Sequence, residues 1–153
     1  MVDQCKDSTI IVGPVSGSIF VRDCENCTVH VACQQFRCRD LKNCTIYLYA
    51  ANDPVIEASS NLTFAPFNIG YPHLREHANA AGLDPTVNKW ELVFDFSHKG
   101  EDNFKVLPPS EWSTRIESIE GFEEEEGEIV FDYPVRYGGS QSDSKPMSSA
   151  EQD

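Results

Sequence analysis

Basic residues are scarce in this chain of 153 residues. It has 12 lysines and arginines against 25 aspartates and glutamates, which gives a formal net charge of −13. A nucleic-acid binder needs a basic face to neutralise phosphates, so this composition argues against a nucleic-acid partner. An anionic membrane surface is disfavoured for the same electrostatic reason. A basic surface on another protein is compatible with the charge.

Long hydrophobic runs are also missing. No stretch reaches the roughly 20 apolar residues of a transmembrane helix, so we expect no direct insertion into a membrane. The first residues, Met1–Cys5, have neither the basic start nor the apolar run of a signal peptide, and they lack the Met-Gly start needed for myristoylation. We therefore expect a cytoplasmic protein with reduced thiols.

The six cysteines all fall between Cys5 and Cys44. In a secreted protein this density would indicate a disulfide framework. Cys24 and Cys27 have the spacing of half a zinc site, but no second Cys-x-x-Cys pair supplies the other two ligands. We expect no metal site, because the repeat described next gives the cysteines another role.

A repeat of 17 to 19 residues is the main structural signal. It is defined by Thr9, Thr28, Thr45 and Thr63, each preceded two positions earlier by Asn or Asp. Helical-pair repeats run to about 33 residues or more, so this period is too short for them. It fits one coil of a parallel β-helix, in which stacked coils bury a continuous inner column of side chains.

The repeat predicts where several residue types lie. Cys27 and Cys44 recur at one coil position, followed by Leu62, which indicates an inner ladder of small apolar side chains. The Asn or Asp before each of them suits a corner, because these residues tolerate the backbone conformation found there. The loop 13–18 lacks the Gly-Lys-Ser/Thr ending of a phosphate-binding loop, so we interpret it as a coil corner.

The repeat stops after Phe67. Tyr71–Gly82 predicts a short helix that covers the open end or one face of the solenoid, and apolar segments at 90–96 and 104–107 should pack back onto the coils. We predict one all-β domain over residues 1–120. Residues 121–153 are acidic and Ser-rich, which predicts a largely flexible tail.

The predicted helix contains His73-Leu74-Arg75-Glu76-His77, which matches the His-x-x-Glu-His pattern of one metalloprotease class. Such a protease also needs a distant third ligand and a cleft. We interpret the two histidines as part of the exposed polar face of the helix.

Residues 34–40 are polar where a coil should run as a strand. Arg37 and Arg39 are two positions apart, so they project from the same face of a strand, whereas Phe36 and Cys38 would point into the core. On composition alone, outward arginines form a solvated face, paired here to acids such as Asp40 or Glu57.

The segment Cys33-Gln34-Gln35-Phe36-Arg37-x-Arg39-Asp40 resembles the signature of the tubulin-binding cofactor C domain family. The resemblance extends through residues 13–20 and 54–61. Within this family, the X-linked retinitis pigmentosa 2 protein branch in particular is similar in four further segments: residues 81–83, 88–90, 95–96 and 100–103. Together the matching segments span residues 3–108.

The resemblance implies a right-handed parallel β-helix that activates a GTPase. The retinitis pigmentosa 2 branch acts on an Arf-like small GTPase in ciliary protein trafficking, and cofactor C acts on tubulin in tubulin folding. Arg37 matches the arginine finger of the family, and Gln34 and Gln35 match the glutamines beside it. The partner would bring GTP and Mg²⁺, so no cofactor of the chain's own is implied.

Further positions match residues near the partner or its nucleotide. Gly17 and Ser18 match a loop of the preceding coil, Phe36 lies within the signature, and Arg39 and Glu57 match supporting positions. The family also implies a location in the cytoplasm, at the ciliary base or on the cytoskeleton.

Two other functions fit the same fold. The domain could bind a GTP-loaded GTPase or tubulin without catalysis, as an effector or scaffold. The cyclase-associated proteins, which bind actin monomers, share the β-helix type but lack the Gln-Gln-Phe-Arg segment.

Overall fold

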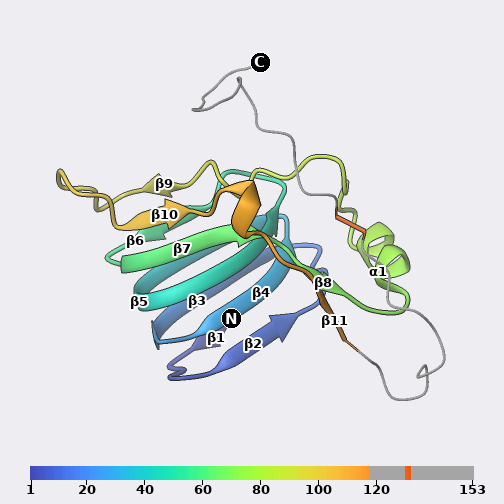
Figure 1. Ribbon diagram of the computed structural model, residues 1–153, viewed down its shortest axis with the longest axis horizontal. Helices are drawn as coiled ribbons and strands as arrows, with labels where there is room; N and C mark the ends of the chain where they lie inside the picture. Colours follow the sequence, from blue (N-terminus) through green and yellow to red (C-terminus); the bar gives the residue numbers. More distant parts are fainter. Residues whose placement is uncertain (118–129, 132–153) are drawn as a thin grey trace.

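The computed structural model describes residues 1–117 and 130–131, and it is a β-solenoid of about four turns (Figure 1). Its strands pair in parallel between successive coils. The predicted parallel β-helix is therefore confirmed.

Two stacks of strands form the walls of the solenoid. The first wall contains β1 (Val2–Asp3), β3 (Ser18–Glu25), the first half of β5 (Gln35–Ala50), β6 (Val55–Glu57) and β9 (Phe94–Asp95). The second wall contains β2 (Thr9–Val12), β4 (Thr28–Cys33), the second half of β5, β7 (Ser60–Pro66) and β10 (Phe104–Val106). A short separate pair joins β8 (Ile69–Gly70) to β11 (Arg115–Ile116).

The register confirms the repeat. Thr9 lies opposite Thr28, Thr28 opposite Thr45, and Thr45 opposite Thr63. One sequence period therefore equals one coil.

The corners explain the recurring Asn and Asp. Asp7, Asn26, Asn43 and Asn61 have φ angles of 52°, 55°, 53° and 54°, in the left-handed region that Asn and Asp visit more readily than other side chains. The side chains also join neighbouring coils, since the Asn26 amide donates to the Asp7 carboxylate at 3.1 Å. The predicted role of these residues at the corners is confirmed.

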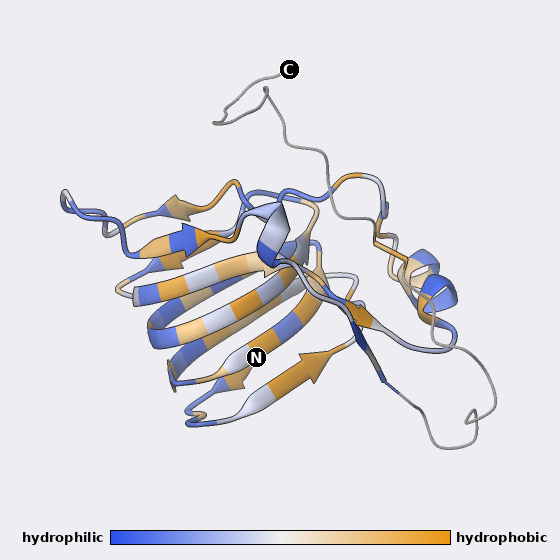
Figure 2. Cartoon of the chain, in the orientation of Figure 1, coloured by the Kyte–Doolittle hydropathy of each residue, from blue (hydrophilic) through white to orange (hydrophobic). Residues whose placement is uncertain are grey.

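The residue after each of the three Asn corners points inward. Cys27, Cys44 and Leu62 are 1–2% exposed, which confirms the predicted ladder. Phe36, Leu41 and others fill the same interior, and Figure 2 shows apolar and polar positions interspersed along the strands. Fully burying one such large side chain stabilises the fold by about 1.5–3 kcal/mol.

All six cysteines are free thiols. The Cys24 thiol donates to the carbonyl of Arg22 at 3.3 Å, and the Cys27 thiol to that of Glu25 at 3.4 Å. Within residues 1–117 and 130–131, no three His, Cys, Asp or Glu side chains gather as a metal site would require. Cys24 and Cys27 thus serve as core side chains.

Helix α1 (Leu74–Ala80) is shorter than the predicted span Tyr71–Gly82. His73 has a φ of 70°, so helical geometry begins only after it. At the other end Gly82 has a φ of 72°, and the N–H groups of Gly82 and Leu83 donate to Asn79 and Ala78. This is a Schellman ending, which requires a left-handed residue.

The helix lies beside the coils rather than over an open end (Figure 1). Its buried residues Leu74 and Ala78 belong to a second apolar cluster, with Tyr49 from the second wall and Phe67, which directly follows β7. The helix thus covers one side of the solenoid, which was one of the two predicted places. Among the described residues, no helix has the length and apolar character needed to cross a membrane.

The later segments return to the solenoid as predicted. β9 pairs with β6 and β10 with β7, followed by the 3₁₀ turn η1 (Pro109–Glu111). The predicted tail, 121–153, lies outside the described residues except for Val130 and Phe131. Both are at most 5% exposed, and the Phe131 ring lies 4.5 Å from that of Tyr49. These two residues therefore belong to the packed domain, because they fill the second apolar cluster.

Candidate functional site

The beginning of β5 presents its side chains alternately to the core and to solvent. Phe36 and Cys38 are 0% and 2% exposed, and the Phe36 ring meets that of Phe64 edge-on at 6.2 Å. Arg37 and Arg39 are exposed on the first wall. The predicted alternation is confirmed, and burial of Phe36 fixes the backbone from which Arg37 projects.

Arg37 lies in a column of apolar neighbours. Phe20 of the coil below and Val55 of the coil above are its register partners, and Phe94 lies beyond Val55. Phe20 and Val55 are half-buried, whereas Phe94 is 52% exposed. Apolar neighbours suit the methylene stem of an arginine and leave the charged end in solvent.

The guanidinium of Arg37 makes no ion pair or hydrogen bond with any residue of the described part of the chain. Arg39 differs, because it contacts Asp40 at 3.7 Å and lies in register between Arg22 and Glu57. The acid-paired surface expected from composition therefore holds for Arg39 but not for Arg37. Arg37 is the arginine of this segment whose charge is available to a partner.

Gln34 joins three segments just before β5. Its side-chain amide donates to the carbonyl of Gly82 at 3.1 Å, and its backbone N–H donates to the carbonyl of Gly17 at 3.0 Å. Its own carbonyl accepts from the backbone and side-chain nitrogens of Asn52 at 3.0 and 3.1 Å. These bonds hold the backbone leading to Arg37, so Gln34 has a positioning role that the sequence analysis missed.

Gln35 and Ser18 lie opposite each other on adjacent coils. The Gln35 amide donates to the carbonyl of Asp53 at 3.1 Å. Gly17 is open, since a Cβ there would meet no atom within 4 Å. The predicted residues Gly17, Ser18, Gln34, Gln35, Arg37, Arg39 and Glu57 are therefore brought together on or beside the first wall, with Phe36 behind them. The catalytic role of the two glutamines stays a prediction.

A buried asparagine holds the end of β5 in place. Asn88 is 2% exposed, and its side-chain oxygen accepts from the N–H groups of Ala50 and Trp90 at 3.0 and 3.1 Å. Its amide donates to the carbonyl of Leu48 at 3.1 Å. Asn88 lies in residues 88–90, one of the segments that carry the resemblance, but the resemblance does not give this role. These three side-chain bonds are all to the backbone, which no residue pattern specifies.

Among the described residues, the His-x-x-Glu-His segment does not gather with a third ligand as a metal site would require. His73 bonds the Glu76 carboxylate, which lowers the pKa of that acid, and His77 bonds the hydroxyl of Tyr71 at 2.7 Å. The two histidines thus face different partners.

Known proteins are similar in sequence to the part of the chain that contains the first wall and Arg37. Residues 1–96 match the family described as Tubulin binding cofactor C. The chain is 36% identical over 112 residues to tubulin-specific chaperone C of Homo sapiens, covering 71% of this chain and 32% of the relative. It is 32% identical over 114 residues to TBCC domain-containing protein 1 of Mus musculus, covering 72% of this chain and 21% of the relative.

A solved structure has the same fold. Tubulin Binding Cofactor C from Leishmania major matches with a TM-score of 0.61 and 26% identity, over 74% of this chain and 82% of that chain. The chain spans only about a third of chaperone C and about a fifth of TBCC domain-containing protein 1. Membership of the retinitis pigmentosa 2 branch stays a prediction. At the level of the family the comparisons are decisive: the chain belongs to the tubulin binding cofactor C family.

Proposed function

We propose that this domain binds tubulin through the first wall and that Arg37 enters the partner's nucleotide site to accelerate GTP hydrolysis. The observation that carries the proposal is the exposed guanidinium of Arg37, which has no partner among the described residues. The relatives' names favour tubulin, because one of them is called a tubulin-specific chaperone.

The chemistry required of Arg37 is charge stabilisation. Negative charge develops on the phosphoryl group during GTP hydrolysis, and an arginine supplied in trans accelerates such reactions by about 10³- to 10⁵-fold. A guanidinium can bridge two oxygens at once, which an ammonium group cannot do as well. The partner would bring the GTP and Mg²⁺.

The mounting of Arg37 suits this role. Its strand is held from behind by Phe36 and at its start by Gln34, so little backbone order has to be gained on docking. Phe20, Val55 and Phe94 surround it with apolar surface that would exclude water from the contact.

An Arf-like small GTPase is the second candidate partner. The same arginine would serve there, and the Gln34–Arg37 segment carries the resemblance that suggests it. A non-catalytic role would use the same wall to hold tubulin or a GTPase without changing its hydrolysis rate. The predicted cytoplasmic, ciliary-base or cytoskeletal location stays a prediction.

Single-turnover GTP hydrolysis by tubulin, and separately by an Arf-like GTPase, tests the proposal with the wild type, Arg37→Ala and Arg37→Lys. Lys42→Ala is the matched control, because Lys42 is an exposed cation of the same strand, near a corner. We expect stimulation that both Arg37 variants lose and the control keeps. If the chain binds tubulin without stimulating GTP hydrolysis, the arginine finger is rejected and the non-catalytic binding role is retained. If the chain stimulates hydrolysis only by the Arf-like GTPase, that GTPase replaces tubulin as the proposed partner.

A further inference from the structure

The strand β2 is an open edge of the second wall. It pairs with β4, and no other strand in the described ranges pairs with it. The N–H of Thr28 donates to the carbonyl of Ser8, and backbone groups alternate in direction along a parallel strand. The backbone groups of Ile10 and Val12 therefore face β4, whereas those of Thr9 and Ile11 face the open edge. Such an edge can accept a further strand.

An apolar pocket of 280 Å³ lies at the end of this strand. It exists partly because Gly13, next after β2, has no side chain, and a Cβ there would lie 3.1 Å from the Tyr71 hydroxyl. Ile11, which lines the pocket at the edge strand, is 42% exposed. The pocket is lined by Ile11, Val12, Gly13, Phe67, Ile69, Tyr71 and Glu117.

The edge and the pocket are spaced for one extended ligand. Side chains two residues apart point to the same face of a strand. A strand added beside β2 could therefore place one apolar side chain against Ile11 and the next into the pocket beside Gly13. Backbone hydrogen bonds would supply affinity and the pocket would supply specificity, as in other cases of strand addition.

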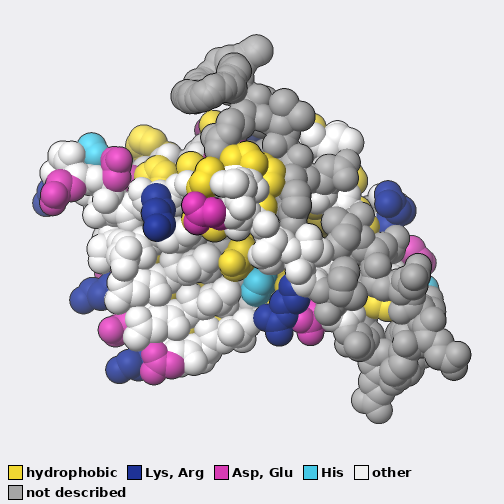
Figure 3. Space-filling view, in the orientation of Figure 1, with side chains coloured by type: hydrophobic (Ala, Val, Ile, Leu, Met, Phe, Trp, Pro, Cys, Tyr) yellow, Lys and Arg dark blue, Asp and Glu magenta, His cyan; other side chains and the backbone are white. Residues whose placement is uncertain are grey.

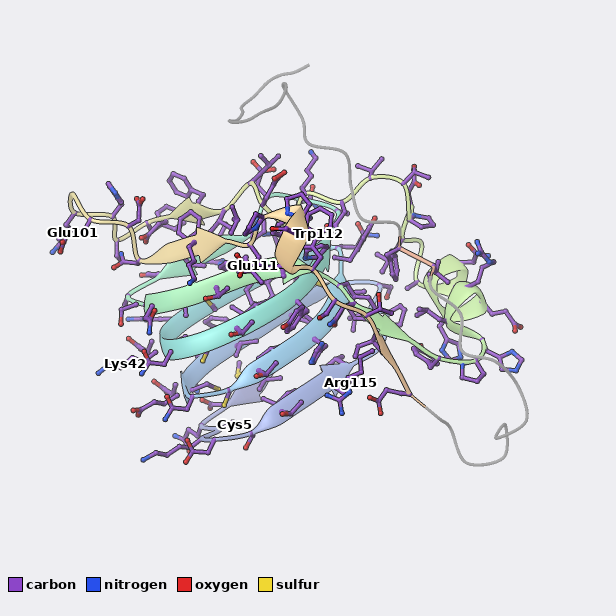
Figure 4. The ribbon with its side chains drawn as sticks, viewed as in Figure 1. Cys5, Lys42, Glu101, Glu111, Trp112 and Arg115 are labelled. Atoms are coloured by element: carbon purple, nitrogen blue, oxygen red, sulfur yellow. The ribbon has the colours of Figure 1, made fainter. Side chains whose placement is uncertain are left out.

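Charge decides which kind of occupant fits. The near face of the second wall carries few charged side chains (Figure 3), and Arg115, which lies on β11 (Figure 4), contacts Glu117 and so neutralises it. The chain as a whole carries a net charge of −13. Two copies of the chain would repel each other, whereas a basic segment would be attracted.

We propose that the β2 edge and its pocket bind an extended segment of a partner protein in which apolar residues alternate with polar ones and lysines or arginines flank them. This site is separate from the first wall and goes beyond the proposed function. It gives the domain a second contact, so that a basic peptide and a GTP-binding protein can be held together.

Fluorescence anisotropy with labelled, end-blocked heptapeptides tests this site. The probe is Lys-Val-Thr-Leu-Thr-Val-Lys, and the comparison peptides replace its lysines by glutamates, its central leucine by proline, or its alternation by a contiguous apolar block. The chain variants are Ile11→Pro, which removes an edge-facing donor, and Ile69→Lys, which places a charge in the pocket. Arg37→Ala is the control on the other wall.

We expect only the basic alternating peptide to bind well, with about tenfold weaker binding by each pocket or edge variant and none of that loss in Arg37→Ala. Amide signals of residues 9–13 should shift on binding in a ¹⁵N correlation spectrum, and circular dichroism should show both variants folded. Equal binding of all peptides, or shifts confined to the first wall, would overturn the proposal. The proposal would also be overturned if the chain formed a dimer and Ile11→Pro abolished that dimer, because a second copy of the chain would then be the occupant of the edge.

Discussion

The side-chain amide of Gln34 donates a hydrogen bond to the carbonyl of Gly82, 48 positions away in the sequence, at 3.1 Å. Gly82 lies two residues beyond helix α1, in the left-handed turn that closes it, and Gln34 lies three residues before Arg37. The end of the helix and the beginning of the arginine-bearing strand are therefore held together by one amide group.

Replacing Gln34 by alanine should lower the free energy of unfolding by about 1 kcal/mol, the usual contribution of such a bond. It should also speed amide hydrogen exchange at Gly82 and Leu83, whose N–H groups close the helix. Urea unfolding and exchange mass spectrometry measure the two effects, with Lys42→Ala as control. Unchanged exchange at the helix end would contradict a positioning role.

The corner asparagines should prefer glycine to alanine as a replacement. Asn43 has a φ of 53°, and left-handed geometry costs an ordinary L-residue about 1–2 kcal/mol. Asn43→Ala should therefore lower the free energy of unfolding by about 1 kcal/mol, and Asn43→Gly by a few tenths. Urea denaturation compares them. Equal losses would point instead to the hydrogen bond that Asn61 donates to Asn43.

Stability should fall as the pH drops below about 6.5, in part because of His30. Burial lowers the pKa of this histidine from 6.5; Arg115 acts in the same direction, and the Asn68 hydrogen bond and Glu117 oppose it. The unfolded state then takes up the proton first, so this contribution to stability is full above pH 6.5 and is lost as the pH falls toward the lowered folded pKa. Urea midpoints between pH 5 and 8 measure it.

The matched variant for this effect is His30→Gln, which keeps a hydrogen-bonding group near Asn68 but does not titrate. Its midpoint should depend less on pH over the same range. An unchanged slope would show that groups other than His30 cause the pH dependence.

Most thiols should resist alkylation in the folded state. Burial raises the pKa of Cys24 to about 11 and those of Cys33 and Cys38 to about 12, so little of the reactive thiolate forms at pH 8. Iodoacetamide should modify the half-buried Cys5 first and all six cysteines only in denaturant. Mass spectrometry counts the adducts. Rapid modification of Cys38 without denaturant would contradict its buried position in the folded state.

Phe94 should contribute to partner binding more than to catalysis. It is 52% exposed at the upper end of the Arg37 column, so Phe94→Ser should change stability little and weaken partner affinity by about 1–2 kcal/mol. Hydrolysis at saturating partner should stay near wild type, in contrast with Arg37→Ala. Affinity and saturating rate can be separated in one titration, and a loss of rate alone would remove Phe94 from the docking surface.

Local periodicity made much of the fold predictable from sequence. The spacing of Thr9, Thr28 and Thr45 equals one coil, and the alternation of Phe36, Arg37, Cys38 and Arg39 follows from the two-residue period of a strand. Each of these features depends only on residues within one coil or on the equivalent residue of the neighbouring coil. That is why a repeat in the sequence is enough to place them.

The sequence by itself thus determined the stacked coils, their corners and the outward direction of Arg37. Only the tertiary structure decided that Arg37 lacks an acidic partner among the described residues, that Gln34 bonds Gly82, and that Phe131 enters the apolar cluster beside Tyr49. These contacts join segments that share no period, because they form where a helix or loop docks on the finished solenoid. Their geometry depends on the shape of the whole packed surface, which no local pattern of residues encodes.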